Sequence, residues 1–263
     1  MAVKKIVEGK TKIIWTTENP EVVLIENKDD ITAGDGARKD SLVSKGKIAT
    51  TTTVNAFRLL KKTKIPNHFI NQVSPTSFTV HKATMIPLEC VARRIAFGSF
   101  IKRNPHIPEG KRMKIIPVEF YIKDDKRHDP ILEIKKDSDK ALLFSPKDPV
   151  STRTSVGKVE LKKLGITHRD ILKMKSITRK VFRTFENTWA EQDVTLVDMK
   201  IEFGKNEKGK IMVADVIDND SWRIWPKGDK SKMLDKQSYR DGKDLETILK
   251  NYKKVEKMTN NFI

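Results

Sequence analysis

The chain has 263 residues, 37% of them hydrophobic, which is enough to bury a core in one large domain or in two lobes that share a cleft. In the N-terminal stretch MAVKKIVEGK, charged residues interrupt the apolar run before it reaches the length of a signal peptide. No later window approaches the ~18 apolar residues of a membrane span. The single Cys90 excludes an internal disulfide. We therefore expect a cytoplasmic protein that contacts no membrane.

The charge balance raises nucleic-acid binding as an alternative function. Lys and Arg number 53 against 35 Asp and Glu, a formal net charge of +18. Much of the excess is lysine scattered through expected surface segments such as 61–64 and 205–210, rather than arginine gathered with aromatic residues. We therefore expect no nucleic-acid partner and favour a basic surface that draws in small anionic substrates.

The first thirty residues predict a β-hairpin. Strand-forming residues run from Ile6 to Trp15 and again from Val22 to Glu26, with a Glu-Asn-Pro turn between them. Gly9 interrupts the first strand, inside the motif Glu-Gly-Lys-Thr-Lys at 8–12. Lysines beside a glycine suit a polyphosphate lying across the hairpin, although the same residues also fit a twisted surface strand with solvated charges.

The remaining elements give an α+β pattern that begins mostly with sheet. In the first half we expect a glycine-containing loop at 32–38, a helix that stops before Pro66, strands between Phe69 and Phe100 broken by Pro75 and Pro87, and a short strand at 113–121. In the second half we expect a loop at 145–155, a helix capped by Thr167, strands at 195–203 and 210–217, and a closing helix through 245–255. The apolar stripe of the helix after Thr167 is interpreted as core.

The segment 196–204 carries charged residues at alternate positions. In a strand, Asp198, Lys200 and Glu202 share one face. The opposite, apolar face then consists of Val197, Met199, Ile201 and Phe203. The pattern fits either an ordinary half-exposed strand, whose acidic and basic side chains neutralise one another, or a functional row of charges.

The next strand, 211–217, favours the functional interpretation. With a hairpin turn centred on Lys208-Gly209, Glu202 lies directly opposite Asp215, with Cβ atoms about 5 Å apart. Two carboxylates at that distance repel each other unless a cation lies between them, and Mg²⁺ binds through one or two carboxylates together with substrate phosphates. We therefore predict a magnesium site, which a one-residue shift of register would disrupt.

Two further segments hold arginine beside aromatic residues or glycine. Arg223 lies between tryptophans, where it is either a rigid fork for phosphate or carboxylate, or a side chain that merely stacks on one of these tryptophans in the core. In 85–99, a strand with Arg93 leads into Gly98-Ser99, where amide, hydroxyl and guanidinium groups can converge on a phosphate. Both segments are candidates for anion binding.

Together these segments resemble the SAICAR synthetase family, whose members are phosphoribosylaminoimidazole-succinocarboxamide synthases. The resemblance covers nearly the whole chain, in order: EGKTK at 8–12, TAGDGAR at 32–38, MIPLECVARRIAFGS at 85–99, KDDKRHDP at 123–130, LVDMKIEFG at 196–204 and ADVIDNDSWRIWP at 214–226. ITAGDGARK, VIDNDSWR and DKQSYRD are similar to the animal form in particular, in which this domain is fused to a carboxylase. Phe97 departs from the family pattern, which has a small residue before Gly-Ser.

The resemblance implies an α+β fold with antiparallel sheets and an ATP-grasp or kinase-like nucleotide cleft. One SAICAR synthetase domain would span 1–263, with an N-terminal sheet lobe over approximately 1–85 and a C-terminal lobe over approximately 86–263. The implied cofactors are ATP and Mg²⁺, and the further substrates are carboxyaminoimidazole ribonucleotide (CAIR) and L-aspartate. The resemblance also implies either a homo-oligomer or a fusion to, or association with, an AIR carboxylase domain.

Family roles map onto matching positions of this sequence. The residues expected to bind ATP are Gly9, Lys10, Lys12 and Lys123 at the phosphates and Met85 and Glu89 at the adenosine. Magnesium would be held by Glu202 and Asp215. The residues expected to bind the substrates are Asp35, Arg38, Arg93, Ser99, Asp220 and Arg223, of which Arg93, Ser99 and Arg223 would hold the ribonucleotide phosphate. The catalytic residues would be Lys12, Lys123, Asp198 and Lys200, the last two facing the reacting carboxylate.

The implied reaction must make a carboxylate electrophilic, because an amine cannot displace oxide from it. Phosphoryl transfer from ATP would give an acyl phosphate, which the aspartate amine attacks; positioning and charge neutralisation supply most of such catalysis. A kinase is the alternative, since His168-Arg169-Asp170 matches the start of a protein-kinase catalytic loop. These residues open a periodic helix, and Lys175 stands where that loop needs asparagine, so we favour the ligase.

Overall fold

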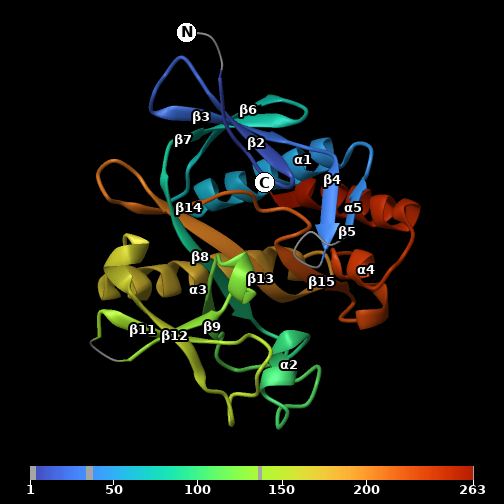
Figure 1. Ribbon diagram of the computed structural model, residues 1–263. Helices are drawn as coiled ribbons and strands as arrows, with labels where there is room; N and C mark the ends of the chain where they lie inside the picture. Colours follow the sequence, from blue (N-terminus) through green and yellow to red (C-terminus); the bar gives the residue numbers. More distant parts are fainter. Residues whose placement is uncertain (1–3, 34–37, 136–137, 263) are drawn as a thin grey trace.

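The computed structural model describes residues 4–33, 38–135 and 138–262 of the chain. Within these ranges, two large antiparallel sheets and a small two-stranded sheet are joined and covered by helices (Figure 1). The fold is therefore α+β with antiparallel sheets, as the sequence predicts. None of the helices in the described part of the chain is both long and apolar enough to cross a membrane.

The first sheet comes from the N-terminal part of the chain. Its strands, in spatial order, are β1 (Lys5–Glu8), β2 (Lys12–Thr16), β3 (Val22–Asn27), β7 (Ser77–His81) and β6 (Phe69–Ser74). The prediction of one strand from Ile6 to Trp15 is wrong: the chain turns at Gly9, whose N–H donates to the carbonyl of Lys12 at 2.8 Å, and β1 and β2 pair with each other. The Gly-Lys motif is consequently a loop at the end of a hairpin.

Helices α1 (Lys45–Lys62) and α5 (Leu245–Thr259) lie side by side near this sheet (Figure 1). Helix α1 ends at Lys62, before Pro66 as predicted, because Lys64 adopts a left-handed φ of 54° and the N–H of Ile65 turns back to the carbonyl of Leu60. A buried cluster joins both helices to the small sheet β4 (Asp30–Ala33) and β5 (Arg38–Ser41); its members are Ile31, Leu42, Ile48, Tyr239, Ile248 and Tyr252. The C-terminal helix therefore packs against the N-terminal part of the protein, and the division into two lobes near residue 85 stays a prediction.

The second sheet is built on two long central strands, β8 (Thr84–Arg93) and β13 (Val194–Lys205). Outward from β8 follow β9 (Val118–Ile122), β10 (Ile131–Ile134), β11 (Lys140–Phe144) and β12 (Ser155–Glu160). Outward from β13 lie β14 (Ile211–Ala214) and β15 (Trp222–Pro226). Helix α2 (Ser99–Arg103) follows β8, and α4 (Gln237–Arg240) follows β15.

Pro87 does not break β8, contrary to the prediction, whereas Pro75 does lie in the turn between β6 and β7. Proline has no N–H to give to a neighbouring strand. Pro87 is tolerated because the pairing of β8 with β13 is irregular there, with a shift of register between Glu202 and Gly204. The strand expected at 113–121 is also displaced, since β9 covers Val118–Ile122.

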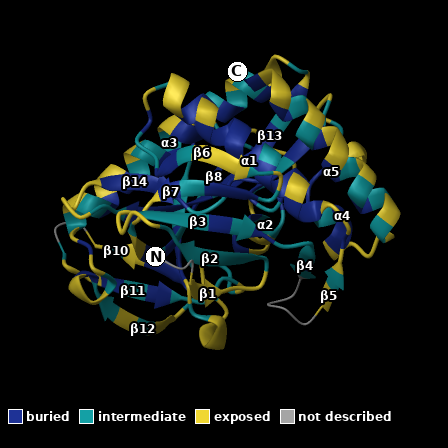
Figure 2. Cartoon of the chain, turned by 90° about the horizontal axis from the view of Figure 1, so that it is seen from above, coloured by how far each residue is buried: buried dark blue, intermediate teal, exposed yellow. Residues whose placement is uncertain are grey.

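Helix α3 (His168–Ala190) packs across β8, β9 and β13 and supplies much of the core. Figure 2 shows the buried residues, in dark blue, along this helix and the strands of the sheet. Thr167 caps it, as predicted: its hydroxyl accepts the N–H of Asp170, whose carboxylate accepts the N–H of Thr167. The stripe interpreted as core is buried, including Phe182, Phe185 and Trp189. His168-Arg169-Asp170 is thus a helix start and not a kinase catalytic loop.

The hairpin of β13 and β14 has a register one residue away from the predicted one. Glu202 lies opposite Ala214, not Asp215, because the turn spans Asn206 to Lys210 and Lys205 pairs with Ile211. The predicted apolar face of β13 also needs correction at one position. A bulge follows Leu196 in the pairing with β15, and Val197 joins a separate cluster with Ile95, Phe97 and Trp225.

Candidate active site

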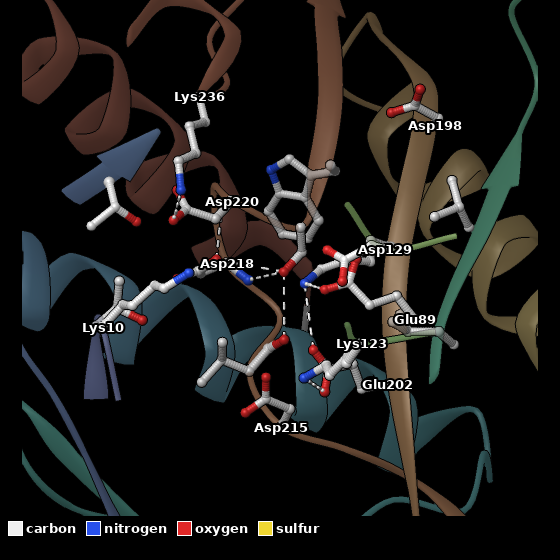
Figure 3. A pocket seen from close by; sticks show the side chains of 18 of the residues that line it. Lys10, Glu89, Lys123, Asp129, Asp198, Glu202, Asp215, Asp218, Asp220 and Lys236 are labelled. Carbon is white, nitrogen blue, oxygen red and sulfur yellow. Dashed lines mark hydrogen bonds and ion pairs between the residues drawn. The ribbon is translucent and has the colours of Figure 1, made fainter. Parts of the chain in front are cut away.

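A cleft of about 940 Å³ is lined by β8 and β13 together with the ends of β2, β9 and β14 and the polar turn before β15. Eleven of the residues predicted to bind or act on substrates line it: Lys10, Lys12, Glu89, Arg93, Lys123, Asp198, Lys200, Glu202, Asp215, Asp220 and Arg223. In Figure 3, Lys123, Glu89 and Glu202 gather in one group, Asp220 and Lys236 form a second, and Asp198 lies apart. The cleft is therefore a polar site with separate centres of charge.

Glu202 and Asp215 form the acidic centre, although they are not opposed in the hairpin. Asp215 follows β14 with a φ of 67°, in the left-handed region that aspartate tolerates better than most residues, and its side chain also lines the cleft. Burial, and then the charge of Asp215, raises the pKa of Glu202. Two carboxylates that interact in a buried site suit a divalent cation bound together with phosphates.

Lysines balance both carboxylates. Lys12 forms an ion pair with Asp215, and the Nζ of Lys123 lies 2.5 Å from Oε2 of Glu202. Burial by itself would raise the pKa of Asp215, but Lys12, Lys200 and Lys123 outweigh it and hold that pKa below its usual range. Asp215 is consequently ionised at neutral pH, next to lysines that can also reach an anionic ligand in the cleft.

His68 supports Asp215 from behind. Its ring is buried, and burial lowers its pKa to about 4, so the imidazole is neutral at neutral pH. Nε2 lies 3.0 Å from the carbonyl oxygen of Asp215 and must donate, because a carbonyl only accepts. His68 was missed by the sequence analysis, since nothing local signals a contact with a residue almost 150 positions away.

Lys200 connects the acidic centre to Glu89 on the neighbouring strand. Its Nζ lies 2.7 Å from Oε1 of Glu89 and 3.4 Å from Oε1 of Glu202. Burial would lower the pKa of Lys200, but Glu89 and Glu202 reverse that effect and raise it. Lys200 therefore stays cationic and provides a fixed positive charge rather than a general base.

Arg93 and Arg223 form a basic centre around Asp198. Oδ2 of Asp198 accepts from Nη1 of Arg93 at 2.6 Å and from Nη1 of Arg223 at 2.5 Å. Nε of Arg223 is buried and has no hydrogen-bond partner among the described residues. A guanidinium has five N–H donors, so the bond from Nη1 to Asp198 leaves others on this cleft-lining residue for a ligand. A Cβ on Gly98, which has a φ of 63°, would lie only 3.3 Å from that guanidinium, so the loop before Ser99 must approach it as glycine.

Phe97 accounts for part of this packing. Its ring meets that of Trp225 edge-on, with centroids 5.2 Å apart, and the guanidinium carbon of Arg223 lies 5.4 Å from the centre of the Phe97 ring. Arg223 thus lies over the ring of Phe97, and not over a neighbouring tryptophan as the second interpretation had it, and it also lines the cleft. Its role as a fork for phosphate or carboxylate stays a prediction.

A further centre was only partly foreseen. Asp220 was predicted, but its partners were not: Lys236 Nζ lies 2.8 Å from Oδ2, and the hydroxyl of Tyr252 donates to Oδ1 at 2.8 Å. Asp218 also lines the cleft, and burial together with Asp220 raises its pKa. Asp218 lies in the motif ADVIDNDSWRIWP and Lys236 in DKQSYRD. Their position in motifs of the family was the one sign in the sequence that these two residues belong to the site.

Four predicted residues are described but do not line the cleft. Gly9 lies beside Lys10 in the β1–β2 turn, Met85 is 42% exposed on β8, and Ser99 is exposed at the start of α2. Arg38 pairs with Asp40 through Nε at 3.2 Å. Asp35 lies outside the described residues. Their roles stay predictions.

Comparison with known proteins decides the family. The family model described as SAICAR synthetase matches residues 5–259. The chain belongs to the SAICAR synthetase family. A phosphoribosylaminoimidazole-succinocarboxamide synthase of Roseiflexus sp. (strain RS-1) is 40% identical, and the match covers 99% of this chain and 98% of that protein. The resemblance inferred from the motifs is thereby confirmed.

Multifunctional relatives extend beyond the matched region. A protein of Caenorhabditis elegans named as probable multifunctional protein ADE2 is 42% identical over 98% of this chain, but the match covers only 58% of that protein. A bifunctional purine synthesis protein of Dictyostelium discoideum is 44% identical over 90% of this chain and 22% of its own length. In these relatives the synthetase region is joined to further sequence.

Solved SAICAR synthetases confirm the fold. The phosphoribosylaminoimidazole-succinocarboxamide synthase of Ehrlichia chaffeensis superposes with a TM-score of 0.81 at 30% identity, covering 98% of each chain. A SAICAR synthetase in complex with ADP gives a TM-score of 0.80 at 32% identity, covering 97% of each chain. The fold of the SAICAR synthetases is therefore the fold of this chain.

Proposed function

We propose that the protein joins L-aspartate to the carboxylate of CAIR in an ATP-dependent reaction of de novo purine (IMP) biosynthesis, which yields SAICAR, ADP and phosphate. The observation that carries this proposal is the composition of the cleft: an acidic centre flanked by lysines and an arginine centre next to it. Among the described residues that line it there is no histidine or cysteine, so no Ser-His or Cys-His pair is available there, and we assign the chemistry to fixed charges.

ATP would lie over the acidic centre. Lys10, Lys12 and Lys123 would contact its phosphates, and Glu202 and Asp215 would hold Mg²⁺, which neutralises phosphate charge when bound. Support for the metal comes from the raised pKa of Glu202, since one cation between the carboxylates relieves their repulsion. Glu89 and Met85 on β8 would accommodate the adenosine, and a relative of 32% identity has been solved in complex with ADP.

CAIR would lie across the arginine centre. Arg93 and Arg223 would bind its phosphate with the hydroxyl of Ser99, and Asp198 and Lys200 would face its imidazole and carboxylate. Asp220 and Arg38, with Asp35, would complete the substrate side of the cleft. In this arrangement the carboxylate of CAIR would lie next to the phosphates bound by Lys12 and Lys123, because Lys200 contacts the acidic centre directly.

Two steps follow from that arrangement. A carboxylate oxygen of CAIR attacks the terminal phosphorus of ATP, the bond to the bridging oxygen breaks, and ADP and an acyl phosphate form. The amine of aspartate then attacks the acyl carbon, phosphate departs with its bonding electrons, and the amine loses a proton to give the amide. The cationic Lys200 would offset the repulsion between the carboxylate and the ATP phosphates in the first step, and would stabilise the oxyanion that forms when the amine adds to the acyl carbon in the second.

The proposal includes a cellular setting. A cytoplasmic enzyme fits the single buried Cys90. The proposal also includes either a homo-oligomer or a fusion to, or association with, an AIR carboxylase domain, and the relatives that carry additional sequence support a fusion to a further domain. No nucleic-acid partner is needed to explain the basic residues in the cleft, because the three substrates are all anions.

The test is ADP release measured with ATP, Mg²⁺, CAIR and aspartate, with each component omitted in turn, and with SAICAR identified as product by mass spectrometry. We expect turnover only with the complete mixture. ADP release that needs neither CAIR nor aspartate, or transfer of phosphate to a hydroxyl substrate, would refute the ligase in favour of a phosphatase or a kinase. Steep, salt-sensitive binding of random DNA would point to the nucleic-acid alternative.

A further inference from the structure

Glu119 on β9 lies behind the arginine centre and touches two arginines. Its Oε2 accepts from Nε of Arg93 at 3.0 Å and from the hydroxyl of Tyr121 at 3.1 Å, and its Oε1 accepts from Nη2 of Arg103. Glu119 does not line the cleft itself. The carboxylate is therefore a support for Arg93, whose Nη1 is directed to Asp198.

Arg103 links this carboxylate to a different segment of the chain. It is the last residue of α2, its side chain is fully buried, and its Nη1 donates to the carbonyl of Pro146 at 3.4 Å. Helix α2 starts at Ser99, directly after the Gly98 that lies against Arg223. One side chain thus fixes both Arg93 and the helix that carries Ser99, two parts of the proposed phosphate site.

The charges of this cluster give Glu119 two effects of opposite sign. Arg93, Arg103 and Arg223 face Glu119 and Asp198, so the cluster has an excess of one positive charge. As a charge, Glu119 weakens the attraction for a phosphate; as a support, it holds the guanidinium of Arg93 in one orientation. Preorganised donors bind an anion more tightly than mobile ones, because less freedom is lost on binding.

We propose that Glu119 is a positioning residue for the ribonucleotide phosphate, and that it acts by fixing Arg93 and the Ser99 helix relative to each other. This inference rests on the proposed function, since it takes the phosphate of CAIR as the ligand of Arg93. It adds a residue outside the cleft to the determinants of substrate affinity.

The variant Glu119→Gln separates the two effects, because it keeps the shape of the side chain while removing its charge. A purely electrostatic role predicts tighter binding of CAIR. A positioning role predicts that the KM for CAIR rises about tenfold, the factor expected for loss of one charged hydrogen bond, while the KM for ATP stays within about twofold.

Glu186→Gln is a matched control. Glu186 on α3 accepts from Nε and Nη2 of Arg94, at 2.7 and 2.8 Å, and from Arg112 at 2.8 Å, so it also joins two arginines, yet neither Glu186 nor these arginines line the cleft. Both variants should lower the melting temperature, because both remove a charge from a largely buried ion pair. Only Glu119→Gln should raise the KM for CAIR.

The outcomes are distinct. An unchanged or lower KM for CAIR in Glu119→Gln, or an equal rise in Glu186→Gln, overturns the inference while the ligase activity of the parent protein stands. Absence of activity in the parent protein refutes the proposed function instead. Should Glu119→Gln not fold, Glu119→Asp takes its place: it keeps the charge but is one methylene shorter, so it cannot reach both arginines, and a KM equal to that of the parent protein overturns the inference.

Discussion

Replacing Asp215 with asparagine tests the acidic centre most directly. The substitution keeps the size of the side chain and the left-handed backbone, which asparagine tolerates well, and it removes one of the two carboxylates assigned to Mg²⁺. Asparagine can still accept a hydrogen bond from Lys12, but the ion pair between Lys12 and residue 215 is lost. The change therefore acts on metal affinity, activity and stability at once.

The structure gives the expected size and sign of each effect. Because the pKa of Asp215 is held below its ordinary value of 3.8, the ionised carboxylate stabilises the fold at neutral pH, and this contribution is lost as pH falls below 3.8 towards the lower folded pKa. The ion pair is partly buried, with 15% of the Asp215 side chain exposed, so we expect a loss of about 1–2 kcal/mol, or roughly 2–6 °C in melting temperature. Loss of a metal ligand should lower kcat/KM by about 100-fold or more and raise the Mg²⁺ requirement at least about tenfold.

The assay combines thermal unfolding without metal and turnover across a Mg²⁺ titration. Asp170→Asn serves as the control, because Asp170 forms a similar partly buried pair with Lys205, at 2.9 Å, outside the cleft. Both variants should melt earlier, but only Asp215→Asn should change the Mg²⁺ dependence. If Asp215→Asn turns over at the parental rate with an unchanged Mg²⁺ dependence, the pair is structural and the assignment of the metal is wrong.

Three further predictions follow from the other centres. Arg223→Ala should weaken CAIR binding about tenfold or more while ATP affinity changes little, as measured by calorimetry for each ligand, and an equal loss of both would contradict the division of the cleft. Lys12→Ala should act mainly on ATP, raising its KM about tenfold; an unchanged KM and rate would remove Lys12 from the phosphate site. Asp235 is a buried carboxylate between β15 and α4 that accepts the N–H groups of Ile224 and Gln237. Burial raises its pKa to about 6 from 3.8, so native stability falls as pH rises through that window, by up to about 3 kcal/mol. Asp235→Asn, which mimics the neutral acid, should therefore lose more stability relative to the parent at pH 4 than at pH 7.5 in chemical denaturation; a pH-independent difference would show that Asp235 does not titrate in this range.

Local backbone chemistry made several elements predictable from the sequence alone. The cap at Thr167, the apolar stripe of α3 and the end of α1 before Pro66 were all confirmed, because each depends on residues within a few turns of one another. The family followed from motifs for the same reason: a contiguous stretch such as 196–204 can be recognised without knowing what it contacts. Both the α+β class and the ligase family can thus be predicted from short, contiguous stretches of sequence.

The tertiary structure decided everything that depends on how distant segments meet. Pairing of β13 with β14 placed Glu202 opposite Ala214, one residue from the prediction, because the turn geometry and not the charge pattern sets the register. The segment predicted as one strand forms two, because the chain turns at Gly9 and β1 and β2 pair with each other in the sheet. Glu119 carried no signal in the sequence, because the role proposed for it depends on contacts with arginines on two other segments. Such contacts exist only once strands and helices from different parts of the chain have packed together.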